Sequence, residues 1–164
     1  MKKYIGLILS FVFLFAFAGI ALGGEVMVIS VSGNVEVTPP VDQRPVKPKV
    51  GMLLKEGTKV VTRERSALEI VFDEEATNIV KISENTHVVI KLDQDNQIEL
   101  VDGELFALLK NLEKDDTFQV RTPCAVCGAR GTGWYMRTDS KVSQVAAFEN
   151  RVYVQGINKD GSVM

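Results

Sequence analysis

Hydrophobic and polar residues alternate along much of this chain with a period of two, which is typical of β-strands with one buried face and one face in water. Val35, Val37, Ile82, Ile98 and Val120 each stand between two polar neighbours. Short β-branched runs of this kind recur about every ten residues, which indicates an all-β fold, a β-sandwich or β-roll of about ten to twelve short strands. The predicted strands are 26–31, 34–38, 58–62, 67–72, 78–82, 87–92, 97–101, 104–109, 117–122, 133–138, 142–148 and 151–155.

Turn-forming residues separate these runs. Ser32-Gly33 and Asp102-Gly103 are predicted as two-residue hairpin turns, because glycine tolerates the positive φ that such turns require. Residues 93–96 form a longer polar hairpin loop, and four prolines between Pro39 and Pro48 indicate an extended surface loop. The stretch 105–112 could be helical but is too short to displace the strand interpretation. No sequence repeat is evident.

The N-terminus has the features of an export signal. Lys2 and Lys3 precede an apolar run from Ile5 to Leu22, and Ala21-Leu22-Gly23 offers small residues for cleavage. We therefore expect a signal peptide at 1–23 and one all-β domain at 24–164. The alternative is an uncleaved anchor, because about 18 apolar residues reach the lower limit for spanning a bilayer. Both alternatives place the domain in the periplasm or another extracytoplasmic space.

Net charge narrows the choice of partners. Without residues 1–23 the chain keeps 17 basic and 21 acidic residues, a net charge of −4. A mildly acidic domain is not expected to bind nucleic acid. No cofactor is expected either, since no cofactor-binding motif emerges. The domain would contact a membrane only through an uncleaved N-terminal segment.

The segment 121–134 is the most unusual part of the chain, since it holds both cysteines and the only tryptophan. Cys124 and Cys127 form a Cys-x-x-Cys pair. Haem attachment is disfavoured because Gly128 stands where an axial histidine would follow. A zinc site lacks ligands, since His87 is the only histidine. A thioredoxin-like centre needs a helix after the first cysteine, and no helical pattern follows.

Two structural alternatives remain for the cysteines, a pair of buried thiols or a local disulfide. In an extended strand their Cα atoms would lie about 10 Å apart. A disulfide needs less than about 7 Å. Cys124 and Cys127 can therefore bridge only if the chain turns between Pro123 and Gly128, although export to an oxidising space favours a bridge.

The other residues that could bind a ligand or take part in chemistry have simpler structural explanations. The spacing of Gly128, Gly131 and Gly133 is not that of a phosphate-binding loop. We expect these glycines where the backbone has a positive φ or where two backbones approach closely. Arg130 is expected to be a paired, partly buried guanidinium rather than an anion site. His87 is expected to be a strand residue. The acidic run 73–75 is expected to form a solvated turn rather than a calcium site. Trp134 and Tyr135 are candidates for a binding surface, although core packing is the commoner use of both residue types. No catalytic residues are predicted.

The block from Phe118 to Thr132 resembles the signature of FecR-type domains, with Thr122, Pro123, Gly128, Arg130, Gly131 and Thr132 as its most specific part. The segments 31–35, 50–60 and 98–105 are similar to that family as well, as are Thr62, Ser66 and Leu68. The resemblance implies an extracytoplasmic β domain that relays a signal, as in regulators that pass an iron-siderophore signal to a sigma factor. Only residues 1–4 precede the apolar run, so we expect no counterpart of the sigma-binding segment of those regulators.

The sequence therefore predicts a stand-alone FecR-like module, not an enzyme, that binds an envelope protein or an envelope polymer and relays a signal. A structural or assembly component of the envelope, with self-association through unpaired strands, is the second hypothesis. A thiol-disulfide protein that uses Cys124 and Cys127 is the third.

Overall fold

The computed structural model of this 164-residue chain describes residues 26–73, 75–92, 97–110, 118–129 and 131–164. The expected signal peptide, the loop 93–96, Glu74 and Arg130 lie outside these residues. Within the described ranges, no helix is long and apolar enough to cross a membrane.

The all-β prediction is confirmed, because the described chain forms one curled sheet of 13 strands. The strands are β1 (Val26–Ser32), β2 (Val35–Thr38), β3 (Leu53–Leu54), β4 (Lys59–Thr62), β5 (Ala67–Val71), β6 (Asn78–Ile82), β7 (His87–Ile90), β8 (Ile98–Leu109), β9 (Phe118–Arg121), β10 (Ala125–Ala129), β11 (Gly133–Thr138), β12 (Ser143–Ala147) and β13 (Val152–Gly156). Neighbouring strands are antiparallel except β8 and β9, which are parallel over a short register.

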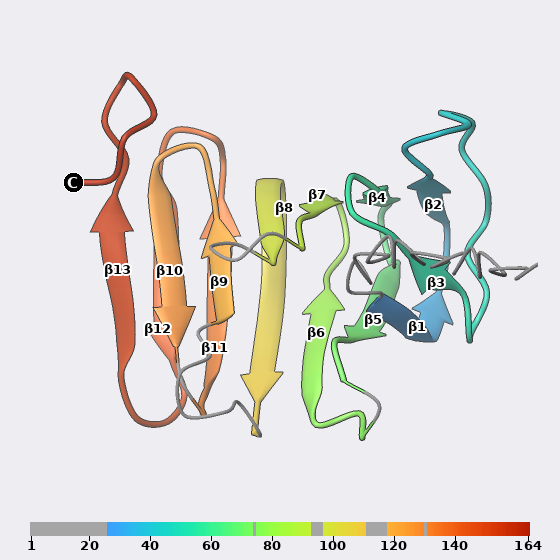
Figure 1. The fold of residues 1–164 in the computed structure, drawn as a ribbon, viewed down its shortest axis with the longest axis horizontal. Coiled ribbons are helices and arrows are strands. Elements are labelled where there is room, and N and C mark those ends of the chain that lie inside the picture. Colours follow the sequence, from blue (N-terminus) through green and yellow to red (C-terminus); the bar gives the residue numbers. More distant parts are fainter. Residues whose placement is uncertain (1–25, 74, 93–96, 111–117, 130) are drawn as a thin grey trace, which may run out of the picture.

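The sheet curls into two layers that share β8 (Figure 1). Layer A runs in the order β3-β1-β5-β6-β8-β11-β12, and layer B in the order β2-β4-β7-β8-β9-β10-β13. Figure 1 shows β11 and β12 behind β9 and β10, with β13 as the outermost strand at one side.

Alternating side chains from both layers form one hydrophobic core. Trp134 and Met136 of layer A and Val120 of layer B are fully buried. Aromatic rings join the layers, since Phe118 of β9 lies 6.0 Å from the Trp134 ring centroid and 4.9 Å from that of Phe72. Such edge-on aromatic contacts add to the energy of burial.

The two predicted hairpin turns are wrong. β1 pairs with β3 and β5 whereas β2 pairs with β4, so Gly33 lies at a corner where the chain passes from layer A to layer B. Gly103 lies inside β8, which is one strand from Ile98 to Leu109 rather than two. The register of β8 shifts beside His87, and the strand crosses between layers there. The extra residue of this bulge is Val101, between Leu100 and Asp102, and Gly103 with a φ of +97° follows it inside the strand instead of forming a turn.

The two glycine corners have the same local structure, although no repeat is visible in the sequence. The amide of Asn34, after Gly33, donates to Ser66 Oγ at 2.7 Å, and Ser66 Oγ donates to the carbonyl of Glu64. The amide of Glu104, after Gly103, donates to Thr86 Oγ1 at 3.0 Å, and that hydroxyl contacts the carbonyl of Glu84. Each hydroxyl therefore fixes the corner of a neighbouring strand.

Candidate interaction surface

The most specific part of the FecR-like signature builds a hairpin. Thr122 donates its amide to the carbonyl of Ala125 at 2.8 Å, which closes a turn over Pro123 and Cys124 between β9 and β10. The Thr122 hydroxyl accepts the Ala125 amide at 2.9 Å. It also lies 2.8 Å from Ser143 Oγ of β12, so it connects layer B with layer A. Thr122 and Pro123 are therefore explained by the fold.

Both cysteines are free thiols in this structure. The turn at Pro123 and Cys124 ends before β10, so Cys127 lies in an extended strand with its side chain in the core. Burial raises the pKa of Cys127 to about 12, which makes it a poor nucleophile. Cys124 is half-buried, and its Sγ lies 3.0 Å from Ser143 Oγ. Cys127 is therefore buried as expected for a core thiol, Cys124 is only half-buried, and no disulfide joins them in this structure.

Two glycines of the same segment each lie beneath an aromatic ring on an outer face. A Cβ on Gly128 would come within 2.7 Å of Tyr153 Cε1, on the outside of layer B. A Cβ on Gly133 would lie 3.2 Å from Phe148 Cδ2, on the outside of layer A. Aromatic rings that cover glycines in this way replace the missing side-chain contacts of the strand.

Gly131 and Thr132 tie two connections together. Gly131 has a φ of +60°, and its carbonyl accepts a hydrogen bond from Asn150 Nδ2 at 3.2 Å. The Thr132 hydroxyl donates to the carbonyl of Glu149. The connection between β10 and β11 is therefore bonded to the connection between β12 and β13.

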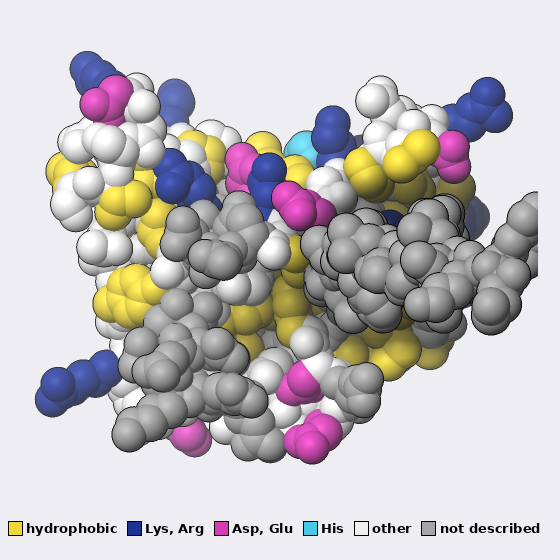
Figure 2. Space-filling model, viewed as in Figure 1, with side chains coloured by type: hydrophobic (Ala, Val, Ile, Leu, Met, Phe, Trp, Pro, Cys, Tyr) yellow, Lys and Arg dark blue, Asp and Glu magenta, His cyan; other side chains and the backbone are white. Residues whose placement is uncertain are grey.

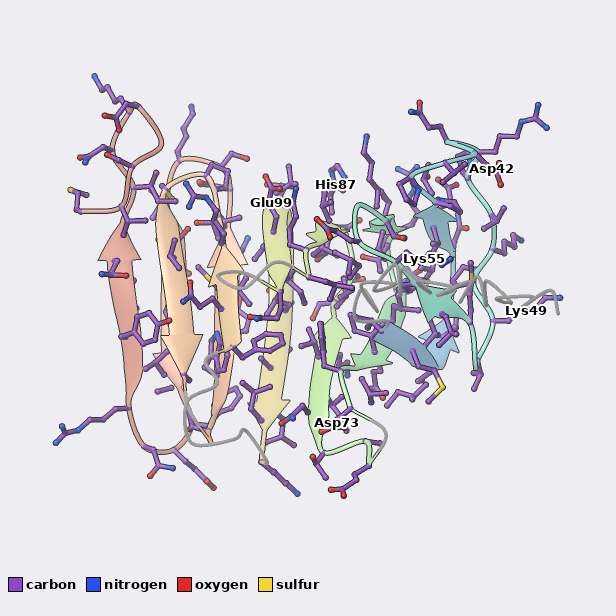
Figure 3. All side chains as sticks on the ribbon, viewed as in Figure 1. Asp42, Lys49, Lys55, Asp73, His87 and Glu99 are labelled. Atoms are coloured by element: carbon purple, nitrogen blue, oxygen red, sulfur yellow. The ribbon has the colours of Figure 1, made fainter. Side chains whose placement is uncertain are left out.

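The remaining polar candidates do not assemble into a site. Figure 3 shows Asp73 at one end of the molecule, with His87 and Glu99 at the other end. The Asp73 carboxylate accepts hydrogen bonds from Thr77 N at 2.8 Å and from Asn78 N at 3.0 Å, so it stabilises the turn between β5 and β6. Among the described residues there is no cluster of three metal-ligating side chains.

The outer face of layer A carries an apolar row that crosses the sheet. Residues directly opposite one another on successive strands make up this row, namely Leu53, Met27, Val71, Ile79, Leu108 and Gly133, with Phe148 beside the last. Leu108 is 43% exposed and Phe148 is 57% exposed. Val71 in the middle of the row is only 2% exposed, so the apolar surface that is open to water lies at the two ends of the row, at Leu53 and at Leu108 with Phe148. Polar residues are the usual occupants of a sheet face in water.

Aromatic side chains extend this row into a patch, which we call the layer A patch and define as Phe106, Leu108, Tyr135 and Phe148. The Phe106 ring lies 5.0 Å from Tyr135 and is stacked at 6.1 Å from Phe148. Tyr135 donates its hydroxyl to Glu104 Oε2 at 2.7 Å. Partial burial and this carboxylate raise the pKa of Tyr135, so the phenol stays neutral and fixed in place.

The outer face of layer B is charged instead. One row across it contains Lys59, Glu99 and Arg121, and Lys91 forms an ion pair with Glu99 at 3.7 Å. Figure 2 shows charged side chains around the single histidine along the upper border of that view. Surface ion pairs of this kind contribute little binding energy. The two outer faces therefore differ, and the apolar one is the better candidate for recognition.

Comparison with known proteins identifies the family. A family model described as FecR protein matches residues 58–153, which is more than half of the chain. The chain belongs to the FecR family. FecR domains are typically periplasmic signalling modules and are not catalytic. The match begins beside β4 and ends in β13, so the FecR domain includes the layer A patch. Neither the curated proteins nor the solved structures searched contain a match to this chain.

Reasoning from the sequence found only one member of the layer A patch. Tyr135 is offered there as part of a binding surface, although core packing is the preferred role, and Phe106, Leu108 and Phe148 receive no functional assignment. A signal was present, since 105–109 is an uninterrupted apolar run and not an alternating one. Such a run indicates a strand with apolar residues on both faces.

Proposed function

We propose that this FecR domain is an extracytoplasmic signal-relay module that binds another envelope protein through the layer A patch. The observation that supports this best is the pair of exposed side chains Leu108 and Phe148, beside the half-buried Phe106 ring, on an otherwise regular sheet face. Aromatic residues are enriched where proteins bind one another, and charged residues are depleted at the centre of such interfaces. Glu104 and Arg137 lie at one border of the patch, where a polar rim is expected.

Affinity capture from the native cell envelope tests the proposal. The bait is the protein as cells export and process it, in wild-type form and as Leu108→Glu. Gln119→Glu is the matched control, because it adds the same charge to the outer face of layer B. We expect one envelope protein to be captured by wild type and by Gln119→Glu and lost with Leu108→Glu. Retention by purified cell-wall polymer instead would make the ligand an envelope polymer.

A structural role in envelope assembly is the second candidate, and one observation favours it. Each layer ends in a strand that pairs on one side only, since β12 pairs only with β11 and β13 only with β10 within the described chain. Open edges of this kind can join a sheet of another chain. If wild type captures nothing and instead assembles with itself, the assembly role replaces signal relay.

A further inference from the structure

The connection from β2 to β4 carries a local excess of positive charge. Residues 41–59 contain five basic and two acidic residues, whereas the rest of 24–164 contains 12 basic and 19 acidic residues. The segment therefore has a net charge of +3 in a domain whose other parts sum to −7. None of its basic side chains forms an ion pair with another residue that the structure describes. Their charge is therefore available to a partner.

Apolar side chains are exposed among these charges. Val41 is 88% exposed, Val50 is 68% exposed and Leu53 is 50% exposed. Val41 and Leu53 line one hollow of about 240 Å³ together with Lys55. A neighbouring hollow lies between Val41 and Arg44. Apolar and basic side chains therefore share one surface, which we call the loop surface and define as Val41, Arg44, Leu53 and Lys55.

Backbone hydrogen bonds hold the loop in place. Val37 and Val46 exchange two of them, at 2.9 and 2.8 Å, which fixes the loop to β2. Gly51 donates its amide to the carbonyl of Val28 at 2.8 Å, which fixes the other end of the loop to β1. Pro48 between these two points is buried. A surface that is already ordered loses little conformational entropy when it binds.

The loop surface lies where the chain arrives from the N-terminal apolar run. Figure 1 shows the connection between β2 and β3 at the outer side of β1 and β2, at the end opposite to β13, and Figure 3 shows Asp42 and Lys49 there. Val26, the first residue of β1, pairs with Leu54 of β3. The apolar run ends at Leu22, and four residue steps span at most about 14 Å. An uncleaved run in a bilayer would therefore hold this end of the domain close to the membrane.

We propose that the loop surface docks on a membrane that contains anionic lipid. Basic side chains at a bilayer are attracted to anionic headgroups, and exposed apolar side chains between them enter the interface. Lysine is depleted where proteins bind one another, which disfavours a protein partner here. From the sequence we expected membrane contact only through the N-terminal segment, because the sequence does not show that the loop brings Val41 beside Leu53 and Lys55.

Docking in this way leaves the proposed binding function free to operate. Leu53 lies at one end of the apolar row on the outer face of layer A, and the layer A patch lies at the other end. A domain that rests on a membrane through its loop surface therefore presents the patch away from the point of contact. The two proposals do not depend on each other.

A fluorescent label at Val41 tests the docking. The exported protein carries Val41→Cys in a Cys124→Ser background and an environment-sensitive dye, while Cys127 is buried and stays unlabelled. Val142→Cys is the matched control, because Val142 is 58% exposed and directly precedes β12 at the opposite end of layer A. The vesicles contain phosphatidylcholine alone or in equal mixture with phosphatidylglycerol. We expect emission to shift to shorter wavelength only for the Val41 label and only with the mixed vesicles.

Dependence on phosphatidylglycerol isolates the contribution of the loop. An uncleaved N-terminal segment would bring the protein to both kinds of vesicle, whereas attraction of the basic side chains requires the anionic lipid. At about 1 M salt the Debye length falls to about 3 Å, so the shift of the Val41 label should disappear.

Paired substitutions measure the electrostatic part. Arg44→Gln with Lys55→Gln removes two charges from the loop surface, and Arg151→Gln with Lys141→Gln removes two exposed charges elsewhere. Each basic side chain near an anionic membrane strengthens binding roughly fivefold, so the first pair should lower the equilibrium constant for docking roughly 25-fold. The second pair, which gives the same net charge, should change it little.

Four results would overturn the proposal. The Val41 label gives no shift with either kind of vesicle, or it gives equal shifts with both. The two paired substitutions weaken docking equally, which would indicate a response to net charge alone. A soluble polyanion such as polyphosphate shifts the label while vesicles do not, which would make the ligand an anionic polymer. Leu108→Glu should leave the shift unchanged, so failure of docking and failure of the proposed binding function are distinguishable.

Discussion

Gly103→Ala is expected to destabilise the protein strongly, because β8 changes layers at this residue. Gly103 has a φ of +97°, which costs a residue with a side chain about 1 kcal/mol or more. An added Cβ would lie 2.6 Å from Thr86 Cα and 2.7 Å from the carbonyl oxygen of Asn85. These are backbone atoms, so relief requires movement of the strand connection, and overpacking of this kind costs about 1 to 3 kcal/mol.

Movement of that connection also weakens the hydrogen bond of 3.0 Å from Glu104 N to Thr86 Oγ1. Its loss adds about 1 kcal/mol. The expected reduction in the free energy of unfolding is therefore about 3 to 5 kcal/mol, a large part of the about 5 to 15 kcal/mol that stabilises a typical domain. Denaturant unfolding followed by circular dichroism measures it, with the slope of the transition checked for a change in the denatured state.

Gly51→Ala supplies the control, because Gly51 has a similar φ of +84° and no atom within 4 Å of an added Cβ. Gly51→Ala should lower the free energy of unfolding by only about 1 kcal/mol, the cost of a positive φ for a residue with a side chain. Gly33→Ala should resemble Gly103→Ala, since an added Cβ there would lie 2.7 Å from the carbonyl oxygen of Arg65. If Gly103→Ala and Gly51→Ala lowered the free energy of unfolding equally, the close approach of backbones at the corner would be refuted.

Three further outcomes follow from individual contacts. Gly128→Ala should cost less than Gly103→Ala, because the half-exposed Tyr153 ring can swing outward, and tyrosine fluorescence should report the greater solvent exposure of that ring. The pKa of Cys127 is raised to about 12 from a usual value near 9, so this thiol adds no pH dependence to the stability below about pH 9. Stability should then fall by up to about 1.4 kcal/mol per pH unit between those two values, because the unfolded thiol ionises first. Cys127→Ala should remove that part of the alkaline slope in denaturant titrations. Asp73→Ala should lower the free energy of unfolding by about 1 to 3 kcal/mol, because two partly buried turn amides lose their acceptor, while Asp73→Asn should restore part of the loss in the same assay.

The period-two pattern predicted most strands because it reflects burial of one face. Val35 and Val37 in β2 alternate with polar residues, and the structure buries both. The pattern failed at β10, where Ala125–Ala129 is buried throughout and therefore does not alternate. It also divided β8 at Gly103, since a glycine with positive φ looks the same in sequence whether it forms a turn or follows a bulge inside a strand.

The family was predictable because its signature lies in one continuous segment. The candidate surface was not, because Phe106 and Phe148 become neighbours only through the order of β8, β11 and β12. The same limit applies to the repeated corners, where Ser66 and Thr86 occupy equivalent places in segments that show no evident repeat. Cross-strand register, which decides both features, is not encoded in local periodicity.

Site-specific photo-cross-linking in living cells tests the central claim most directly, namely that the layer A patch is the binding surface of this FecR domain. A photoreactive residue at Leu108 lies within the patch, and one at Gln119 lies on the outer face of layer B. We predict that Leu108 forms a cross-link to one envelope protein and that Gln119 does not. Cross-links from Gln119 alone, or none from Leu108 while the domain is folded, would contradict the claim.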